Sequence, residues 1–161
     1  MAKDKTQKTN AMRLLDAAGI SYEMASYAYD ESDLSGVHAA AELGVPPETV
    51  FKTLVTRTPK NEYYVFVIPV AESLDLKKAA KAAGAKSIEM IHVKEILDLT
   101  GYVRGGCSPI GMKKAFPTFI DETASLFDKI YFSAGKRGQQ IILEPDKLLE
   151  VTDAEYADLT K

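Results

Sequence analysis

The chain has 161 residues, of which 46% are hydrophobic and 27% charged, so we expect one soluble globular domain covering residues 1–161. Its formal net charge of −3 excludes a general attraction to polyanions, and nucleic-acid binding would need local clusters of basic residues. The single cysteine, Cys107, excludes an internal disulfide and a multi-cysteine metal site. The polar start MAKDKTQKTN and the lack of a long apolar run predict a cytoplasmic protein, and we expect no metal and no cofactor.

Helices are predicted where a capping residue precedes an apolar periodicity and a glycine follows it. Thr9 or Asn10 begins the first of them and Gly19 ends it, while Ser35 and Gly44 bound the second. The predicted helices cover residues 10–18, 35–43, 75–83, 93–99, 145–151 and 153–159, with at most a short helix at 122–127.

Strands are predicted where β-branched and aromatic residues run between turn signals. They cover residues 20–29, 50–58, 62–70, 86–91, 116–121, 130–133 and 140–143. The second and third form the clearest hairpin, with a turn at 59–61. Short strands that alternate irregularly with helices indicate an α+β fold, and we expect a mixed sheet, partly closed like a β-barrel, with short helices around it.

A glycine-rich stretch, GYVRGGCSPIGMKK, occupies residues 101–114. Glycine lets another group approach the backbone closely, so such a loop can aim several N–H groups at a phosphate, a carboxylate or a developing oxyanion. Arg104, Lys113 and Lys114 add positive charge beside it. A glycine-rich connection between two strands without any binding role explains the same composition equally well.

Lys52 lies inside an apolar predicted strand, between Phe51 and Thr53. A lysine in such a strand is paired, extends to solvent or has a function. One interpretation is a cation that binds a phosphate or carboxylate opposite the glycine loop; the other is an edge lysine that discourages strand pairing. The residues themselves predict an anion-binding cleft formed by Lys52, the glycine loop and the turn at 135–138.

No hydrolytic triad can be assembled around His38 or His92, which sit far apart in the sequence. Cys107 is a candidate nucleophile, because nearby Arg104 would favour its thiolate. It is equally compatible with a small buried hydrophobic residue, and we favour that interpretation.

Several segments, taken together and in this order, resemble the YbaK/EbsC family. These are free-standing editing proteins that deacylate Cys-tRNA(Pro), related to the editing domain inserted in bacterial prolyl-tRNA synthetase. The matching segments are SYAYD at 26–30, VFKTLV at 50–55, PVAESLDLKKAAKAAGAK at 69–86, TGYVRGGCSPIGMKK at 100–114, PTFID at 117–121 and SAGKRG at 133–138. The resemblance covers nearly the whole chain and implies an aminoacyl-tRNA deacylase, of the ester hydrolase or lyase type, that acts in translation.

The family's pocket holds the aminoacylated 3′ adenosine of tRNA. The resemblance therefore implies that Lys52 engages the terminal phosphate or ribose, and that Gly106 and its neighbours bring backbone amides to the aminoacyl carbonyl. It assigns substrate binding to Tyr27, Gly105, Cys107, Ser108, Ser133, Gly135, Lys136 and Arg137.

The resemblance also implies that the thiol of the substrate's own cysteine attacks the ester. This attack releases the tRNA and forms a cyclic thiolactone, so that no protein nucleophile is needed. Selectivity for tRNA(Pro) would then come from association with prolyl-tRNA synthetase. Where some relatives carry an aspartate, this chain has Gln139 and Gln140. Two alternatives stay open: another mischarged substrate such as Ala-tRNA(Pro), and a module that binds a nucleotide or tRNA end without catalysis.

Overall fold

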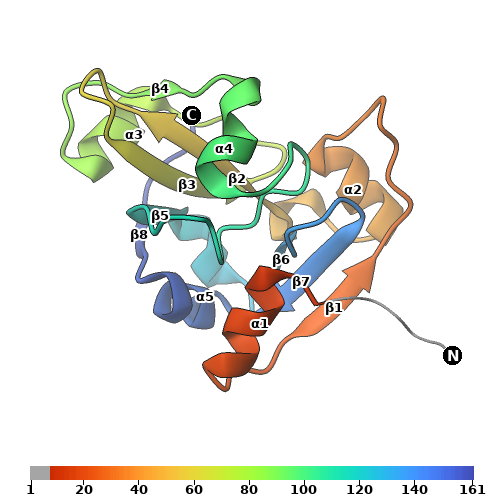
Figure 1. Cartoon of the computed structure of the whole chain (residues 1–161). Helices are drawn as coiled ribbons and strands as arrows, with labels where there is room; N and C mark the ends of the chain where they lie inside the picture. Colours follow the sequence, from red (N-terminus) through yellow and green to blue (C-terminus); the bar gives the residue numbers. More distant parts are fainter. Residues whose placement is uncertain (1–7) are drawn as a thin grey trace, which may run out of the picture.

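The computed structural model describes residues 8–161, whose strands form two separate sheets (Figure 1). One sheet has three antiparallel strands in the order β1-β7-β6, and the other has five strands in the order β4-β2-β3-β5-β8. The strands are β1 (Glu23–Ser26), β2 (Phe51–Arg57), β3 (Tyr63–Pro69), β4 (Glu89–Met90), β5 (Thr118–Asp121), β6 (Ile130–Ser133), β7 (Gln139–Leu143) and β8 (Glu155–Ala157). The first seven residues, with most of the polar start, lie outside the described part.

The predicted α+β class is confirmed, whereas the partial closure into a barrel is not found among residues 8–161. The two sheets meet at one isolated bridge, between Val50 and Tyr131. β2 pairs along its full length with β3, and its other edge reaches β4 only at Thr56 and Arg57. A continuous ladder between the sheets is therefore missing, and the free part of this edge borders the site described below.

The predicted hairpin is confirmed as β2 and β3, with Lys52 opposite Ile68 and Leu54 opposite Phe66. Asn61 takes a left-handed conformation in the turn, with φ of 60°. Residues directly opposite one another share a face of the sheet. Lys52 therefore points to the same face as Leu54, while Thr53 points to the other.

The helices begin at the predicted caps. The side chain of Ser35 accepts a hydrogen bond from the N–H of His38 at 3.2 Å, and left-handed Gly44 ends that helix. The helical segments are α1 (Asn10–Ala17), α2 (Gly36–Leu43), η1 (Pro47–Thr49), α3 (Leu76–Ala83), η2 (Val93–Glu95), α4 (Ile96–Thr100), η3 (Glu122–Leu126) and α5 (Pro145–Thr152). Figure 1 shows α2 beside the three-stranded sheet and α3 beside the hairpin.

The strand expected at 86–91 is reduced to β4, Glu89–Met90. Two further predicted elements differ from the structure. Residues 153–159 do not continue as a helix, because Asp153 adopts φ of 56° and the chain then enters β8, which runs parallel to β5. The strand expected at 20–29 is shorter, since only Glu23–Ser26 pairs with β7. Both differences come from pairing with distant strands, which local propensity does not contain.

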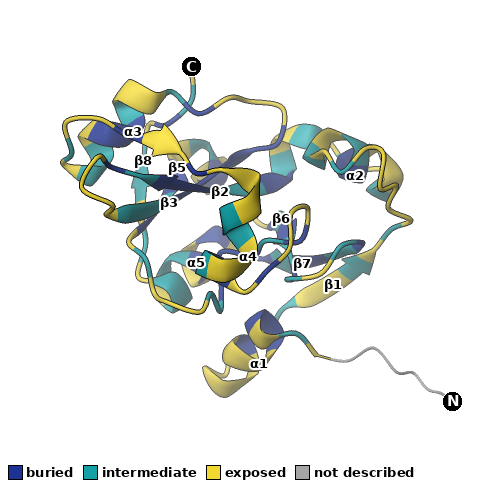
Figure 2. Ribbon diagram, turned by 45° about the horizontal axis from the view of Figure 1, so that its top comes forward, coloured by how far each residue is buried: buried dark blue, intermediate teal, exposed yellow. Residues whose placement is uncertain are grey.

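The apolar core lies on both faces of the five-stranded sheet. One cluster joins α1, β2, β3, β5 and the strands β6 and β7, so it links the two sheets. A second cluster, which includes Phe66 and Ile68, packs under Ala79 and Ala80 of α3. Figure 2 shows β3 dark along the middle of the sheet and the outer surfaces of α1 and α3 exposed. No helix within residues 8–161 is long and apolar enough to cross a bilayer.

Candidate active site

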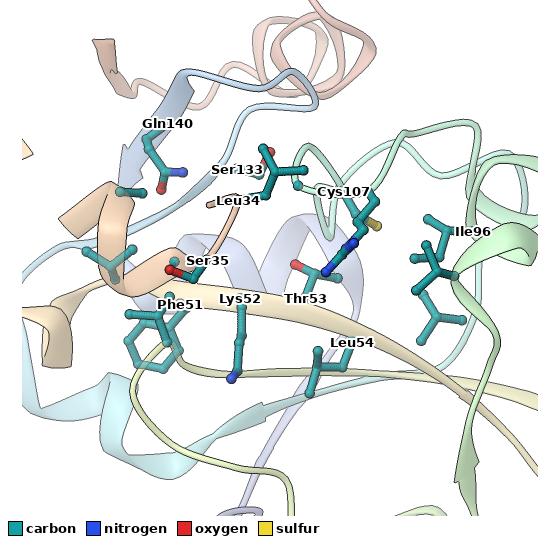
Figure 3. A pocket seen from close by; sticks show the side chains of 18 of the residues that line it. Leu34, Ser35, Phe51, Lys52, Thr53, Leu54, Ile96, Cys107, Ser133 and Gln140 are labelled. Atoms are coloured by element: carbon teal, nitrogen blue, oxygen red, sulfur yellow. The ribbon is translucent and has the colours of Figure 1, made fainter. Parts of the chain in front are cut away.

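A cavity of about 390 Å³ opens between α2, β2, the segment 90–96 and the glycine-rich loop (Figure 3). Its lining combines a few polar groups with a larger apolar surface. The lining residues are Tyr27, Leu34, Ser35, Gly36, Ala39, Val50, Phe51, Lys52, Thr53, Leu54, Val55, Val70, Met90, Ile91, Val93, Ile96, Arg104, Gly105, Cys107, Ser133 and Gln140. The size and the mixed lining suit a small organic ligand or the end of a larger one.

The cavity borders an incompletely paired edge of β2. β4 pairs with this edge only at Thr56 and Arg57, the N–H of Ile91 donates to the carbonyl of Val55 at 3.3 Å, and β6 meets the edge at the isolated bridge between Val50 and Tyr131. The beginning of α2 packs closely against Val70, the residue that follows β3. Gly36 allows this close approach, since a Cβ on Gly36 would lie 2.1 Å from Cγ1 of Val70. The packing at Gly36 therefore requires a residue without a side chain, and it does not require an unusual backbone angle.

Lys52 lies at the margin of the cavity. Figure 3 shows its side chain on the side of β2 shared with Leu54, away from Thr53, Ser133 and Cys107. Burial lowers the pKa of the Lys52 ammonium below its ordinary value of 10.5, and the attraction of Glu72 opposes that shift. The side chain of Lys52 makes no ion pair or hydrogen bond within residues 8–161, while its backbone lies in the ladder opposite Ile68. A half-buried cation without a protein partner is available to an anionic ligand, at a distance from the inner wall of the cavity.

The glycine-rich loop is held in place by its surroundings. The phenol of Tyr102 donates a hydrogen bond to the carbonyl of Ile110 at 2.7 Å, and Nε of Arg137 donates to the carbonyl of Arg104 at 2.8 Å. Gly106 lies against the turn at 135–138, where a Cβ would come within 3.1 Å of the nitrogen of Arg137. The loop is therefore rigidly supported from behind.

The amide of Gly106, expected to contact the aminoacyl carbonyl, is engaged within the loop. This N–H donates to the carbonyl of Val103 at 3.0 Å, and Gly106 does not line the cavity. Gly105 and Cys107 do line it, and their backbone N–H groups have no hydrogen-bond acceptor within the described residues. These two amides are therefore candidates for binding a ligand, whereas Gly106 packs against the turn at 135–138.

Four further residues expected in the pocket lie behind it. Ser108 is fully buried, and its hydroxyl accepts a hydrogen bond from the N–H of Ile110 at 3.2 Å. Gly135 packs against the ring of Tyr102, because a Cβ on Gly135 would lie 2.7 Å from Cε1 of that ring. Lys136 is exposed outside the cavity, and Arg137 holds the glycine-rich loop as described above. The turn at 135–138 is therefore a support of the site, and the expected cleft does not include it.

Two polar side chains in the lining were not among the predicted pocket residues. Oγ1 of Thr53 and Oε1 of Gln140 are buried, and neither has a hydrogen-bond partner among residues 8–161. Thr53 lies on the same face of β2 as apolar Phe51 and Val55, and Gln140 directly precedes the apolar residues of β7, so the residue pattern alone does not place either side chain in a pocket. The apolar wall of Met90, Val93 and Ile96 was likewise not predicted.

The lining contains two cations, Lys52 and Arg104, but no carboxylate and no imidazole among the described residues. His38 and His92 lie outside the cavity. Residues 8–161 contain no group of three or more histidine, cysteine or acidic side chains able to hold a metal ion. The cavity is consequently positive in charge and poor in groups able to act as a general base.

Cys107 lines the cavity and also packs against the main apolar cluster. Burial raises the pKa of its thiol to about 11, so Arg104 does not produce the thiolate considered above. At pH 7 the thiol of Cys107 is therefore protonated.

We expect Cys107→Ala to keep deacylation within about threefold of the wild-type rate, because the thiol supplies packing and no nucleophile. Single-turnover deacylation of aminoacyl-tRNA measures this directly. A variant that folds normally but has lost all activity would show instead that the Cys107 sulfur takes part in the reaction. Slow reaction of native protein with a thiol reagent at pH 7 is the matching expectation for the wild type.

Comparison with known proteins identifies this arrangement. The model of the aminoacyl-tRNA editing domain family matches residues 34–151, which include most of the cavity. A protein of Enterococcus faecalis named "Putative Cys-tRNA(Pro)/Cys-tRNA(Cys) deacylase EbsC" is 49% identical over 161 residues, covering 99% of this chain and 98% of its own length. The resemblance to the YbaK/EbsC family is therefore confirmed.

Solved structures agree with this result. A "putative trans-editing enzyme for prolyl tRNA synthetase" superimposes with a TM-score of 0.82 at 25% identity, over 97% of this chain and 99% of its own. A crystal structure of a hypothetical protein has a TM-score of 0.86 at 24% identity, over 95% and 100% of the two chains, and shows the same fold. Together with the family match, these similarities show that the chain belongs to the aminoacyl-tRNA editing domain family and is an aminoacyl-tRNA deacylase.

Proposed function

We propose that this deacylase removes cysteine from mischarged Cys-tRNA(Pro) and that the substrate's own thiol is the nucleophile. The observation that carries the proposal is the chemistry of the cavity wall, where no carboxylate and no imidazole is found among the described residues. The thiol of Cys107 is held protonated by burial. A reaction that needs no protein nucleophile and no strong general base suits such a wall, and the relative at 49% identity carries a name with this substrate.

In the proposed reaction the cysteinyl sulfur attacks the ester carbonyl carbon and forms a C–S bond. The C–O bond to the ribose then breaks, and the ribose oxygen takes up the proton that the thiol has lost. Cysteine leaves as a cyclic thiolactone, which water later opens. The protein orients the ester and polarises its carbonyl, and we assign that polarisation to the free amides of Gly105 and Cys107.

We assign the rest of the substrate to the remaining walls of the cavity. Lys52 at the margin, together with exposed Arg104, would bind phosphate of the tRNA end. The apolar wall of Met90, Val93 and Ile96 would take the terminal base. A protein with a net charge of −3 has little electrostatic attraction for the body of a tRNA. We therefore propose that association with prolyl-tRNA synthetase provides the selectivity for tRNA(Pro).

Single-turnover deacylation of Cys-tRNA(Pro), Ala-tRNA(Pro) and Ser-tRNA(Pro) tests this function. We expect rapid loss of cysteine only, because alanine has no side-chain nucleophile and the serine hydroxyl is far less acidic than a thiol. Equal loss of all three amino acids would mean that water or a protein group attacks the ester. Binding of a tRNA end without any deacylation would place the protein among binding modules. Equal discrimination between tRNA species with and without synthetase would contradict the role proposed for that partner.

A further inference from the structure

Gln140 is a buried polar residue that the reaction described above does not use. It lies on β7, is only 6% exposed, and its side chain points into the cavity (Figure 3). Oε1 of Gln140 is buried without a hydrogen-bond partner, and its carboxamide makes no hydrogen bond within residues 8–161. A buried acceptor without a partner costs free energy, so a native protein that keeps one at a cavity wall is expected to satisfy it with a ligand.

The position of Gln140 indicates which part of the ligand it meets. It pairs with Ser133 across β6 and β7, and both side chains line the cavity. Gln140 also follows closely after the turn on which the glycine-rich loop rests. In Figure 3, Ser133 lies between Gln140 and Cys107, whereas Ile96 of the apolar wall lies at the opposite end of the view. Gln140 thus lies beside Ser133 on the wall of the cavity away from Ile96, and Ser133 lies between Gln140 and the loop that would hold the ester carbonyl.

We propose that Oε1 of Gln140 accepts a hydrogen bond from the α-amino group of the aminoacyl ester, so that Gln140 recognises the substrate as an α-amino acid. This inference rests on the proposed function. The α-nitrogen is separated from the carbonyl carbon by a single atom, which keeps the two about 2.5 Å apart. A carbonyl held by the loop amides therefore places the α-nitrogen at the same end of the cavity. No carboxylate lines the cavity among the described residues, so a neutral acceptor has to serve.

The decisive comparison uses Cys-tRNA(Pro) and its desamino analogue, 3-mercaptopropionyl-tRNA(Pro). The analogue keeps the ester and the thiol, and it closes the same thiolactone ring, but it has no α-amino group. We expect wild-type protein to prefer the cysteinyl substrate in kcat/KM by about 10- to 100-fold after correction for the rates in buffer, the range expected for one charge-assisted hydrogen bond. Gln140→Leu is expected to remove most of that preference, and Gln140→Glu, which keeps an acceptor, to retain it.

Gln139→Leu is the matched control. Its Oε1 is also buried without a partner, but Gln139 lies on the other face of β7 and does not line the cavity. This variant is expected to keep the preference unchanged. An unchanged preference in Gln140→Leu, or an equal loss in Gln139→Leu, would overturn the proposal.

A binding measurement separates this inference from the proposed reaction. Stable 3′-amide analogues of cysteinyl-adenosine and mercaptopropionyl-adenosine report the same preference without turnover. If the wild-type protein deacylates neither tRNA but binds the cysteinyl analogue more tightly in a Gln140-dependent way, the inference holds and the proposed reaction fails. Equal affinity for both analogues would contradict the inference even if Cys-tRNA(Pro) is deacylated.

Discussion

Lys52→Met is expected to lower kcat/KM for deacylation by about 10- to 100-fold, through a higher KM more than a lower kcat. The loss corresponds to one charge-assisted contact with phosphate, worth about 1.5–3 kcal/mol. Lys52 points away from the inner wall where the ester would lie, so its contact is present in the bound substrate and the transition state alike. Steady-state kinetics with Cys-tRNA(Pro) give the two parameters separately.

The same substitution is expected to stabilise the fold. Burial lowers the pKa of Lys52, so the folded state disfavours its charged form. The cost is present at neutral pH, and it fades as the pH rises through the folded-state pKa toward the ordinary value of 10.5. Removing the charge should raise Tm at pH 7 by a few degrees, since about 1 kcal/mol corresponds to about 2–4 °C in a chain of this size.

Lys60→Met is the control for both effects, because Lys60 is exposed in the turn of the hairpin and does not line the cavity. It should change neither KM nor Tm appreciably. A Lys52→Met protein with unchanged KM would show that the half-buried ammonium does not meet the substrate, and a lower Tm would show that it stabilises the strand.

Gly36→Ala is expected to cost about 1–3 kcal/mol of stability and to raise KM markedly. A Cβ at this position would lie 2.1 Å from Cγ1 of buried Val70, so α2 has to move away from the end of β3. The backbone of Gly36 has no positive φ that alanine would strain. The effect is therefore steric, and it changes the cavity because Gly36 and Val70 both line it.

A double-mutant cycle isolates this contact. Val70→Ala alone should destabilise the fold by leaving a space in the core, whereas Gly36→Ala combined with Val70→Ala should cost clearly less than the sum of the two. Thermal unfolding and KM for the four proteins provide the comparison. Gly36→Ala alone could instead stabilise α2, as alanine usually does within a helix, and that result would contradict the close approach seen in the structure.

The candidate site was predictable from the sequence only in part. Lys52 was visible as a charge in an apolar strand, and the glycine-rich loop as a cluster of one residue type. The loop's usable amides were not, because a sequence does not say that Gly106 donates to Val103 while Cys107 faces the cavity. The sequence shows Gln140 just after a turn, but its missing hydrogen bond depends on every group around it.

The amino-acid sequence by itself determined the elements whose causes are local. Ser35 and Gly44 bound α2, and the β-branched and apolar runs around the turn at 59–61 form the hairpin. The tertiary structure alone decided that the strands divide into two sheets, that residues 155–157 join β5, and that the turn at 135–138 supports the site without lining it. Those outcomes depend on contacts between residues far apart in the chain, and capping, periodicity and turn signals act only over a few residues.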